Sequence, residues 1–256
     1  MSDTQNLHPS QKKEWNGSYV VKHNAKLIKA SLESENSPLM PNADGFVKSQ
    51  PIINANTGWC LNAKDLIPAQ LTRFNAGYES SVVGTIQSMN KAENRVTEKE
   101  IGLYFNFKGQ DGEFHHSAYF FPEQTVKPES LIDYAQAQLK PKAHLQQELS
   151  KETIKVEKAE DYLGAYVASA KSGAKIEVSP QVAEEFKKNM LAVCNNELTK
   201  TLAERNTSLP KLSDLMYEAD KKGMDMILAI KKDRGIGQKK EKEVEKKFER
   251  TEEMTR

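Results

Sequence analysis

The chain has little cysteine, no long apolar run and no marked excess of either charge. Its two cysteines, Cys60 and Cys194, are too few for the disulfide framework of a small secreted domain, so we expect free thiols. The longest apolar run, Met226–Ile230, is too short to cross a bilayer. The first fifteen or so residues lack the apolar core of a signal peptide. We therefore expect a cytoplasmic protein without a membrane partner.

The near balance of charge limits the kinds of partner. Lys and Arg number 37 against 36 Asp and Glu, which gives a formal net charge of +1. This balance excludes a uniformly basic surface for strong non-specific DNA binding, and it also excludes an acidic mimic of DNA. Any nucleic-acid site must therefore be a local patch. Hydrophobic residues make up 38% of the chain, which is enough for a modest core.

Known signatures of catalysis and metal binding are also missing. HExxH, CxxC and the phosphate-binding GxxxxGK[ST] loop do not occur in the sequence. His115 and His116 are adjacent in a predicted strand, so their side chains point to opposite faces and are poorly placed to share a metal ion. The sequence thus predicts no metal, no cofactor and no enzymatic activity. The alternative is an unrecognised site that joins one of these histidines to a carboxylate.

The first half of the chain alternates helical and strand-like segments. Helical spacing from Tyr19 to Leu32 follows a polar stretch, residues 1–17, that we expect to be mobile. Leu66–Asn75 predicts a short helix that Gly77 ends. Val82–Met89 suits either a strand or a short helix.

A β-hairpin is the clearest local prediction. Ile101–Lys108 alternates apolar and polar residues, the GQDG turn follows at 109–112, and Phe114–Phe121 forms the second strand. Residues 18–127 are therefore predicted to be an α+β module with a small antiparallel sheet, this hairpin and helices.

After Pro122 the pattern becomes helical. Pro128 and Ser179-Pro180 are helix start signals, Lys151–Lys171 is a further candidate helix, and Gly223 is expected to break or kink the last helix. We expect a boundary near residues 127–150, an all-helical region at 128–235, and a charged helix or disordered tail at 236–256. The predicted fold class is α+β.

Two stretches could contact a nucleic acid. In residues 54–64 amides, a hydroxyl, the Trp59 indole and Lys64 lie close together, a mixture that suits phosphate contact and base stacking. The alternative is a capped turn with Trp59 as a core anchor. In the hairpin, Tyr104 and Lys108 share one strand face and could form a stacking platform with Tyr119, or an ordinary solvated face.

The order of these motifs resembles a known family. Pro51–Gly58, Leu61–Lys64, Leu66–Leu71 and Gly77-Tyr78 are similar to the N-terminal single-stranded-DNA-binding domain of ArdC-type antirestriction proteins, which also begins some conjugative plasmid primases. The resemblance covers roughly residues 18–127 and further includes these segments: Ala25–Leu32, Ser37–Pro41, Thr85–Gln87 and Phe120–Gln124.

The sequence departs from the family pattern at three places. Val82–Thr85 replaces an aromatic W-L-T-F segment, and Val96–Gly102 replaces a basic loop and carries Glu98 and Glu100. The HExxH motif of the protease-like domain that follows in ArdC is absent, so no protease-like function transfers to this chain.

The resemblance implies a single-stranded-nucleic-acid-binding accessory protein of a plasmid, phage or other mobile element, acting on DNA or RNA without catalysis. The phosphate contacts would come from basic side chains: Lys22, Lys26, Lys29, Lys64, Arg73, Arg95, Lys99 and Lys108. Stacking would come from Trp59, Tyr78, Tyr104 or Tyr119, with polar contacts from Asn56, Thr57 and Asn62.

A second hypothesis is an interaction or scaffold protein. Its helical C-terminal region would bind a protein partner, and its α+β module would no longer bind DNA. The acidic residues Glu98 and Glu100 in place of a basic loop favour this alternative.

Overall fold

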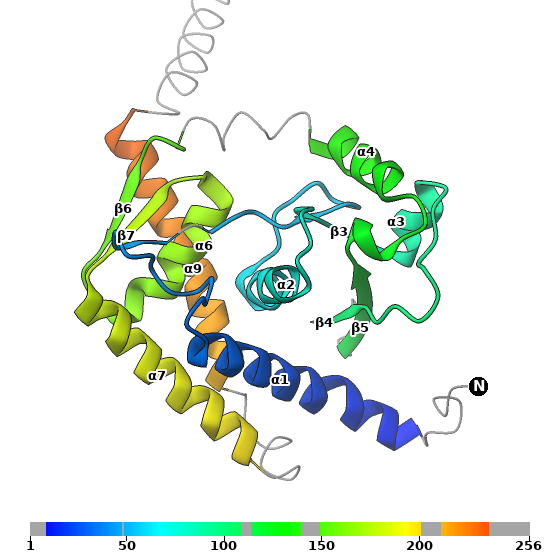
Figure 1. The fold of residues 1–256 in the computed structure, drawn as a ribbon, viewed down its shortest axis with the longest axis horizontal. Coiled ribbons are helices and arrows are strands. Elements are labelled where there is room, and N and C mark those ends of the chain that lie inside the picture. Colours follow the sequence, from blue (N-terminus) through cyan, green and yellow to red (C-terminus); the bar gives the residue numbers. More distant parts are fainter. Residues whose placement is uncertain (1–8, 48, 109–113, 140–148, 201–210, 236–256) are drawn as a thin grey trace, which may run out of the picture.

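The computed structural model describes residues 9–47, 49–108, 114–139, 149–200 and 211–235, with only the backbone described at 9–19, 106–108 and 114–116. In Figure 1 two small sheets lie towards opposite sides of the molecule, with helix α2 (Ala63–Ala76) between them. The α+β fold class is confirmed. The predicted tail at 236–256 and the GQDG turn lie outside the described residues.

The first sheet contains the predicted hairpin. Its strand order is β2 (Ile53–Asn54), β3 (Val82–Thr85), β5 (Phe114–Phe120) and β4 (Leu103–Lys108). β4 and β5 pair antiparallel from Leu103 opposite Tyr119 to Lys108 opposite Phe114, which confirms the hairpin. β2 runs parallel to β3, so the sheet is mixed rather than antiparallel as predicted.

Helix α1 (Pro9–Glu33) packs against β4 and β5 of this sheet and against α2. α1 begins at Pro9, well before Tyr19, where the apolar periodicity starts, so residues 9–17 of the stretch predicted to be mobile are helical. α2 begins after the N-cap Asn62, whose side chain accepts a hydrogen bond from Asp65 N, and it ends at Gly77 in the left-handed conformation. The end of α2 is as predicted, and its start lies three residues earlier.

Residues 82–91 contain both of the structures that the sequence allowed. β3 ends at Thr85, which caps helix α3 (Ile86–Lys91) by a reciprocal bond with Ser88. After β5 a short 3₁₀ turn, η2 (Pro122–Gln124), leads to helix α4 (Pro128–Leu139), which starts at the predicted proline.

The C-terminal half is mainly helical but not all-helical, which corrects the prediction. β6 (Thr153–Val156) and β7 (Lys175–Val178) pair in parallel, and β1 (Phe46–Val47) adds antiparallel to β7. Each C-terminal strand has four residues with two apolar side chains, a pattern too short to separate from the flanking helical periodicity. The connection between β6 and β7 contains the 3₁₀ turn η3 (Ala159–Asp161) and helix α6 (Tyr162–Ser172).

Helices α7 (Pro180–Thr199) and α9 (Lys211–Asp233) complete the fold. α7 starts with Ser179 as N-cap and Pro180 as its first residue, as predicted. Helix α9 continues through Gly223, which neither breaks nor ends it. The glycine serves close packing between helices instead. A Cβ on Gly223 would lie 2.9 Å from the Gly164 carbonyl oxygen of α6, so the glycine lets the two helices approach closely.

One hydrophobic cluster joins the two halves of the chain. It contains Ile28 of α1, Leu66 of α2 and Phe105 of β4 together with Tyr166 of α6 and Ile227 of α9. α1 also contacts α7, and α2 contacts α9. In Figure 1, α2 is seen end-on beside α9. The division near residue 127 therefore remains a prediction, while the packing of the core runs across it.

Candidate nucleic-acid interface

The turn at residues 54–59 has an ordered backbone and an exposed indole. Asn54 Oδ1 accepts from Asn56 N at 2.9 Å, Thr57 Oγ1 accepts from Trp59 N at 3.3 Å, and Gly58 N donates to Asn54 O at 2.8 Å. The capped turn that the sequence allowed is therefore present. Trp59 is not a core anchor, because 62% of it is exposed.

Asn56 links this turn to the start of α3. Its Nδ2 donates to Thr85 Oγ1 at 2.9 Å. Its Oδ1 is buried and has no hydrogen-bond partner among the described residues. An unsatisfied buried acceptor is costly, and this oxygen is closed off from any group outside the protein.

The N-terminus of α2 follows the turn and already holds a carboxylate. Asp220 of α9 accepts from Ala63 N at 2.9 Å through Oδ2, and its Oδ1 pairs with Lys171 Nζ at 2.8 Å. Helix N-termini attract anions, and here a side chain of the same protein takes that position. A phosphate at this helix end would have to displace Asp220.

Asp65 sits in the first turn of the same helix with an unusual pKa. Burial is the largest cause that raises this pKa from 3.8 to about 7, and the Asp220 carboxylate adds to it. Lys64 and the hydrogen bond from Asn62 act in the opposite direction. Asp65 is therefore partly protonated near neutral pH.

Tyr119 and Tyr104 point to opposite faces of the hairpin. Tyr119 is the register partner of Leu103, and cross-strand partners share a face. It packs on Phe105 at 4.8 Å between ring centroids and accepts from Asn54 Nδ2 at 3.3 Å. Tyr104 pairs with Ala118 on the other face, so the predicted platform of Tyr104 with Tyr119 is not formed. The Lys108 side chain lies outside the described part.

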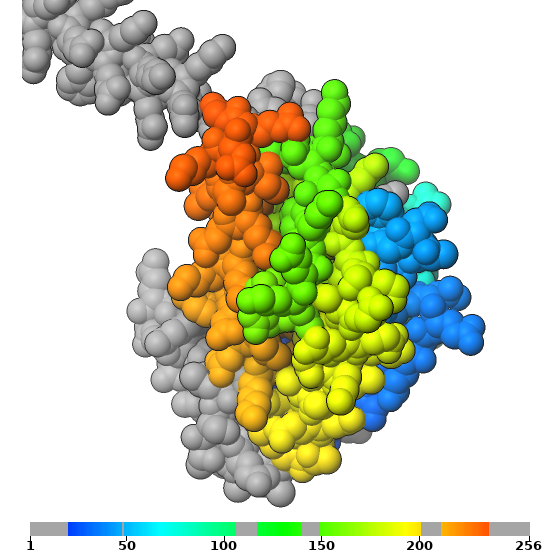
Figure 2. Space-filling view, turned by 90° about the vertical axis from the view of Figure 1, so that its left-hand side faces the viewer, coloured from blue at the N-terminus to red at the C-terminus, as the bar shows by residue number. Residues whose placement is uncertain are grey.

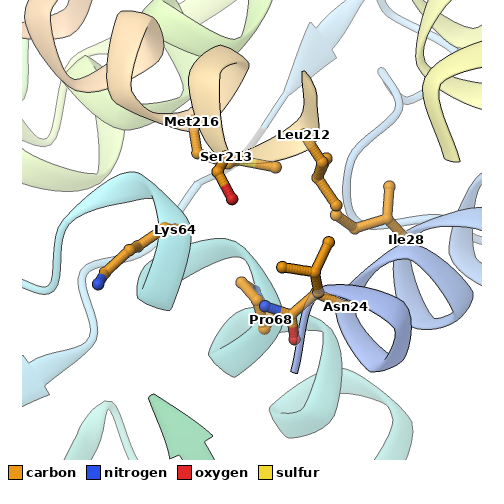
Figure 3. A pocket seen from close by; sticks show the side chains of 8 residues that line it. Asn24, Ile28, Lys64, Pro68, Leu212, Ser213 and Met216 are labelled. Atoms are coloured by element: carbon orange, nitrogen blue, oxygen red, sulfur yellow. The ribbon is translucent and has the colours of Figure 1, made fainter. Parts of the chain in front are cut away.

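Lys64 borders a small cavity between α1, α2 and α9. This cavity has a volume of about 30 Å³, room for about one water molecule and not for a nucleotide. Figure 3 shows the Lys64 side chain extending away from the cavity, with the ammonium group remote from Leu212 and Ile28.

The three lysines of α1 lie on the side of this helix that meets α7 and on its exposed surface. Lys29 Nζ donates to Asn195 Oδ1 of α7 at 2.8 Å and lies 3.8 Å from Glu33. Lys22 is about two turns earlier on the same side, and Lys26 is exposed.

Arg95 and Lys99 are exposed in the loop between α3 and β4. This loop is held by Gln124, whose Nε2 donates to Glu100 Oε2 at 2.9 Å, and by the bridge between Val96 and Thr125. The two cations thus share their surface with Glu98 and Glu100, both exposed.

Arg73 and Tyr78 lie together at the other end of α2. Arg73 Nε donates to Tyr78 O at 3.2 Å, and Nη2 donates to Glu79 O at 2.9 Å. Arg73 and Lys64 are about two and a half turns apart, which places them on opposite sides of the helix. The predicted binding residues therefore do not form one continuous surface.

Sequence reasoning missed the residues that surround Arg73. Phe74 is 51% exposed, and it borders a cavity together with Gln50, Gln70 and Tyr166. The one local sign of this site in the sequence was Phe74, an apolar residue directly before the predicted end of α2. The glutamines and Tyr166 carry no motif, because distant parts of the chain bring them together.

Other chemistry is limited in the described part of the chain. Its His, Cys, Asp and Glu residues form no group of three that could hold a metal ion. Both cysteines are free thiols, and burial is the main cause that raises the pKa of Cys60 to about 11. A thiol of that pKa carries little thiolate at neutral pH. No helix in the described ranges is long and apolar enough to span a membrane.

Comparison with known proteins gives one weak likeness. The chain is similar to the crystal structure of the antirestriction protein ArdC from plasmid R388 in its metal-free form. The match has 14% sequence identity and a TM-score of 0.39, and it covers 81% of this chain and 94% of that chain. No protein family and no curated protein matches the chain.

Proposed function

We propose that the chain binds single-stranded nucleic acid at the surface around Trp59. The observation that carries the proposal is a large aromatic side chain, 62% exposed, on a turn whose backbone is held by its own polar side chains. Exposed aromatic rings on rigid backbone are stacking platforms for unpaired bases. A preorganised backbone loses little conformational entropy when the site binds a ligand.

The residues beside Trp59 complement this role. Thr57 and Asn62 are exposed and carry hydrogen-bonding side chains, and Lys64 follows in the first turn of α2. Lys64 is the one basic residue in the sequence from 49 to 72, so we expect the electrostatic part of binding to be small. We expect micromolar or weaker affinity with a shallow salt dependence. The logarithm of the association constant should fall against the logarithm of the salt concentration with a slope of roughly one for each phosphate contact.

Intrinsic fluorescence tests the proposal directly. Trp15 and Trp59 are the two tryptophans, so the Trp15→Phe variant leaves Trp59 as the reporter. Titration with an oligothymidylate of about 20 nucleotides should quench it, since bases would stack on the indole. Trp59→Ala should weaken binding of a labelled strand by about tenfold in fluorescence anisotropy.

A matched control separates stacking from a general surface effect. Phe46 in β1 is also exposed, 39%, and lies in the other sheet, so Phe46→Ala should leave the affinity unchanged. Equal affinities of the Trp59→Ala variant and the unmodified protein would contradict the proposal. So would the absence of strand binding at low salt.

A protein partner is the second candidate function, and α9 favours it. Tyr217, Met224 and Leu228 are 76%, 45% and 57% exposed, and their spacing of seven and four places them on one side of the helix. Figure 2 shows α9 along the outer surface of the molecule, beside β6 and α7. Under this alternative the full chain captures a partner from a host lysate, Leu228→Glu abolishes the capture, and strand binding does not change.

A further inference from the structure

A cavity of about 390 Å³ lies between the C-terminal end of α2, α6 and the segment before β2. Its volume is within the range of small-molecule sites, roughly 300 to 1,000 Å³. It is separate from the Trp59 turn, which precedes the opposite end of α2. The side chains that matter for recognition are Gln50, Gln70, Arg73, Phe74, Tyr78 and Tyr166.

The floor of this cavity is fixed by buried hydrogen bonds. Gln70 is 6% exposed and donates from Nε2 to Ser49 Oγ at 3.2 Å and to the Gln50 carbonyl oxygen. Its Oε1 accepts from the hydroxyl of Tyr166, which is 1% exposed. Both groups therefore have fixed orientations before any ligand arrives.

The rim is fixed as well. Arg73 holds the carbonyl oxygens of Tyr78 and Glu79, and its Nη1 donates to Gln50 Oε1 at 2.5 Å. The Tyr78 ring packs on Phe121 with 5.3 Å between centroids. Glu123 Oε1 accepts from Glu79 N at 2.9 Å, which anchors the loop that carries Tyr78.

The groups that remain available are hydrogen-bond donors and an aromatic surface. The three bonds of Arg73 use one N–H on each nitrogen, and a guanidinium has a second N–H on both terminal nitrogens. Gln50 accepts through Oε1, and its Nε2 carries two more N–H groups. Phe74 adds a ring that is half exposed. A flat ring with neighbouring acceptor atoms fits this combination.

The surrounding charges favour a neutral ligand over a phosphate. The Tyr78 pKa is raised by burial and by the carboxylates of Glu100 and Glu123, so negative charge already lies on that side. Arg73 is the single cation among the described residues that line the cavity. A guanidinium reads the O6 and N7 atoms of guanine with two N–H groups.

We infer that this cavity binds a 6-oxopurine ring, with the ring on Phe74 and its O6 and N7 atoms facing Arg73 and Gln50. The ring can belong to a free nucleoside or to one guanine of a bound strand. The first case is a separate activity, and the second rests on the strand binding proposed above.

Inosine and adenosine form the matched pair of probes, since they differ in carrying an oxygen or an amino group at C6 and, with it, in whether N1 bears a proton. With the full chain in calorimetry or ligand-observed NMR, inosine should bind roughly tenfold more tightly than adenosine. Phe74→Ala should weaken inosine binding by about tenfold. Phe46→Ala and Trp59→Ala should leave inosine binding unchanged. This first arm of the experiment, with free nucleosides, is therefore independent of the proposed strand site.

A second arm identifies a ring that comes from a strand. An oligodeoxyadenylate with one central deoxyguanosine should bind more tightly than plain oligodeoxyadenylate, and Phe74→Ala should remove the difference. A positive result in either arm supports the inference. It is overturned if neither arm distinguishes the oxopurine from adenine, or if Phe74→Ala has no effect in both.

Discussion

Polar side chains around the Trp59 turn mainly serve the backbone at the scale of single residues. Asn54, Thr57, Asn62 and Thr85 each accept a backbone N–H in a turn or a helix cap. The motif that resembles a DNA-binding family therefore has a local structural role. Trp59 is different, because 62% of this residue is exposed to solvent.

Asp65 should make stability depend on pH. Its folded-state pKa of about 7 lies above the ordinary value of 3.8, so the folded chain holds this proton more tightly than the unfolded chain. The resulting stabilisation is complete below the ordinary pKa and is lost as pH rises through about 7. The free energy of unfolding should fall by on the order of 1 kcal/mol or more between about pH 5 and pH 8.

Asp65→Asn should remove most of this pH dependence, as measured by urea denaturation at the two pH values. Asp225→Asn is the control, since Asp225 is exposed on α9. If the free energy of unfolding of Asp65→Asn still falls as much between pH 5 and pH 8, other groups cause this pH dependence.

Gly58 and Gly77 form a natural pair for a second test. Both have φ of +66°, and a Cβ on Gly58 would lie 2.6 Å from Gln138 O, while Gly77 has no atom within 4 Å. Gly77→Ala should cost about 1 kcal/mol, the strain of the left-handed conformation. Gly58→Ala should cost at least about 1 kcal/mol more, because α4 has to move. Equal losses in thermal denaturation would mean that the 58 turn and α4 are not in firm contact.

At the scale of elements, α2 depends on α9 for one of its caps. Asp220 accepts from Ala63 N and pairs with Lys171 of α6, so one carboxylate joins three helices. Asp220→Ala should lower the free energy of unfolding by roughly 1 to 3 kcal/mol, because Ala63 N and Lys171 lose their partner. Asp225→Ala, on the exposed side of α9, should cost far less. Similar losses in the two variants would argue against this cap.

At the scale of the whole molecule, the two halves share one core. α1 packs on α7, β1 pairs with β7, and α2 packs on α9. A fragment of residues 1–127 would expose all three of these surfaces to water. We expect it to show no cooperative thermal transition, while the full chain does. A sharp transition and well-dispersed NMR amide signals from the fragment would establish the predicted domain boundary instead.

Local patterns in the sequence determined the elements that local interactions stabilise. The hairpin, the end of α2 at Gly77 and the start of α7 at Ser179 follow from turn, cap and alternation signals within a few residues. The turn at 54–59 belongs to the same group, because the bonds that Asn54 and Thr57 accept within the turn span at most four residues.

Only the tertiary structure decided which of these residues share a surface. Strand register turned Tyr119 away from Tyr104, and β7 brought β1 into a sheet. The cavity beside Arg73 joins residues from Pro38 to Tyr166, which no window of sequence contains. Such arrangements depend on long-range packing, whose free energy is shared among many side chains, so no single motif in the sequence marks them.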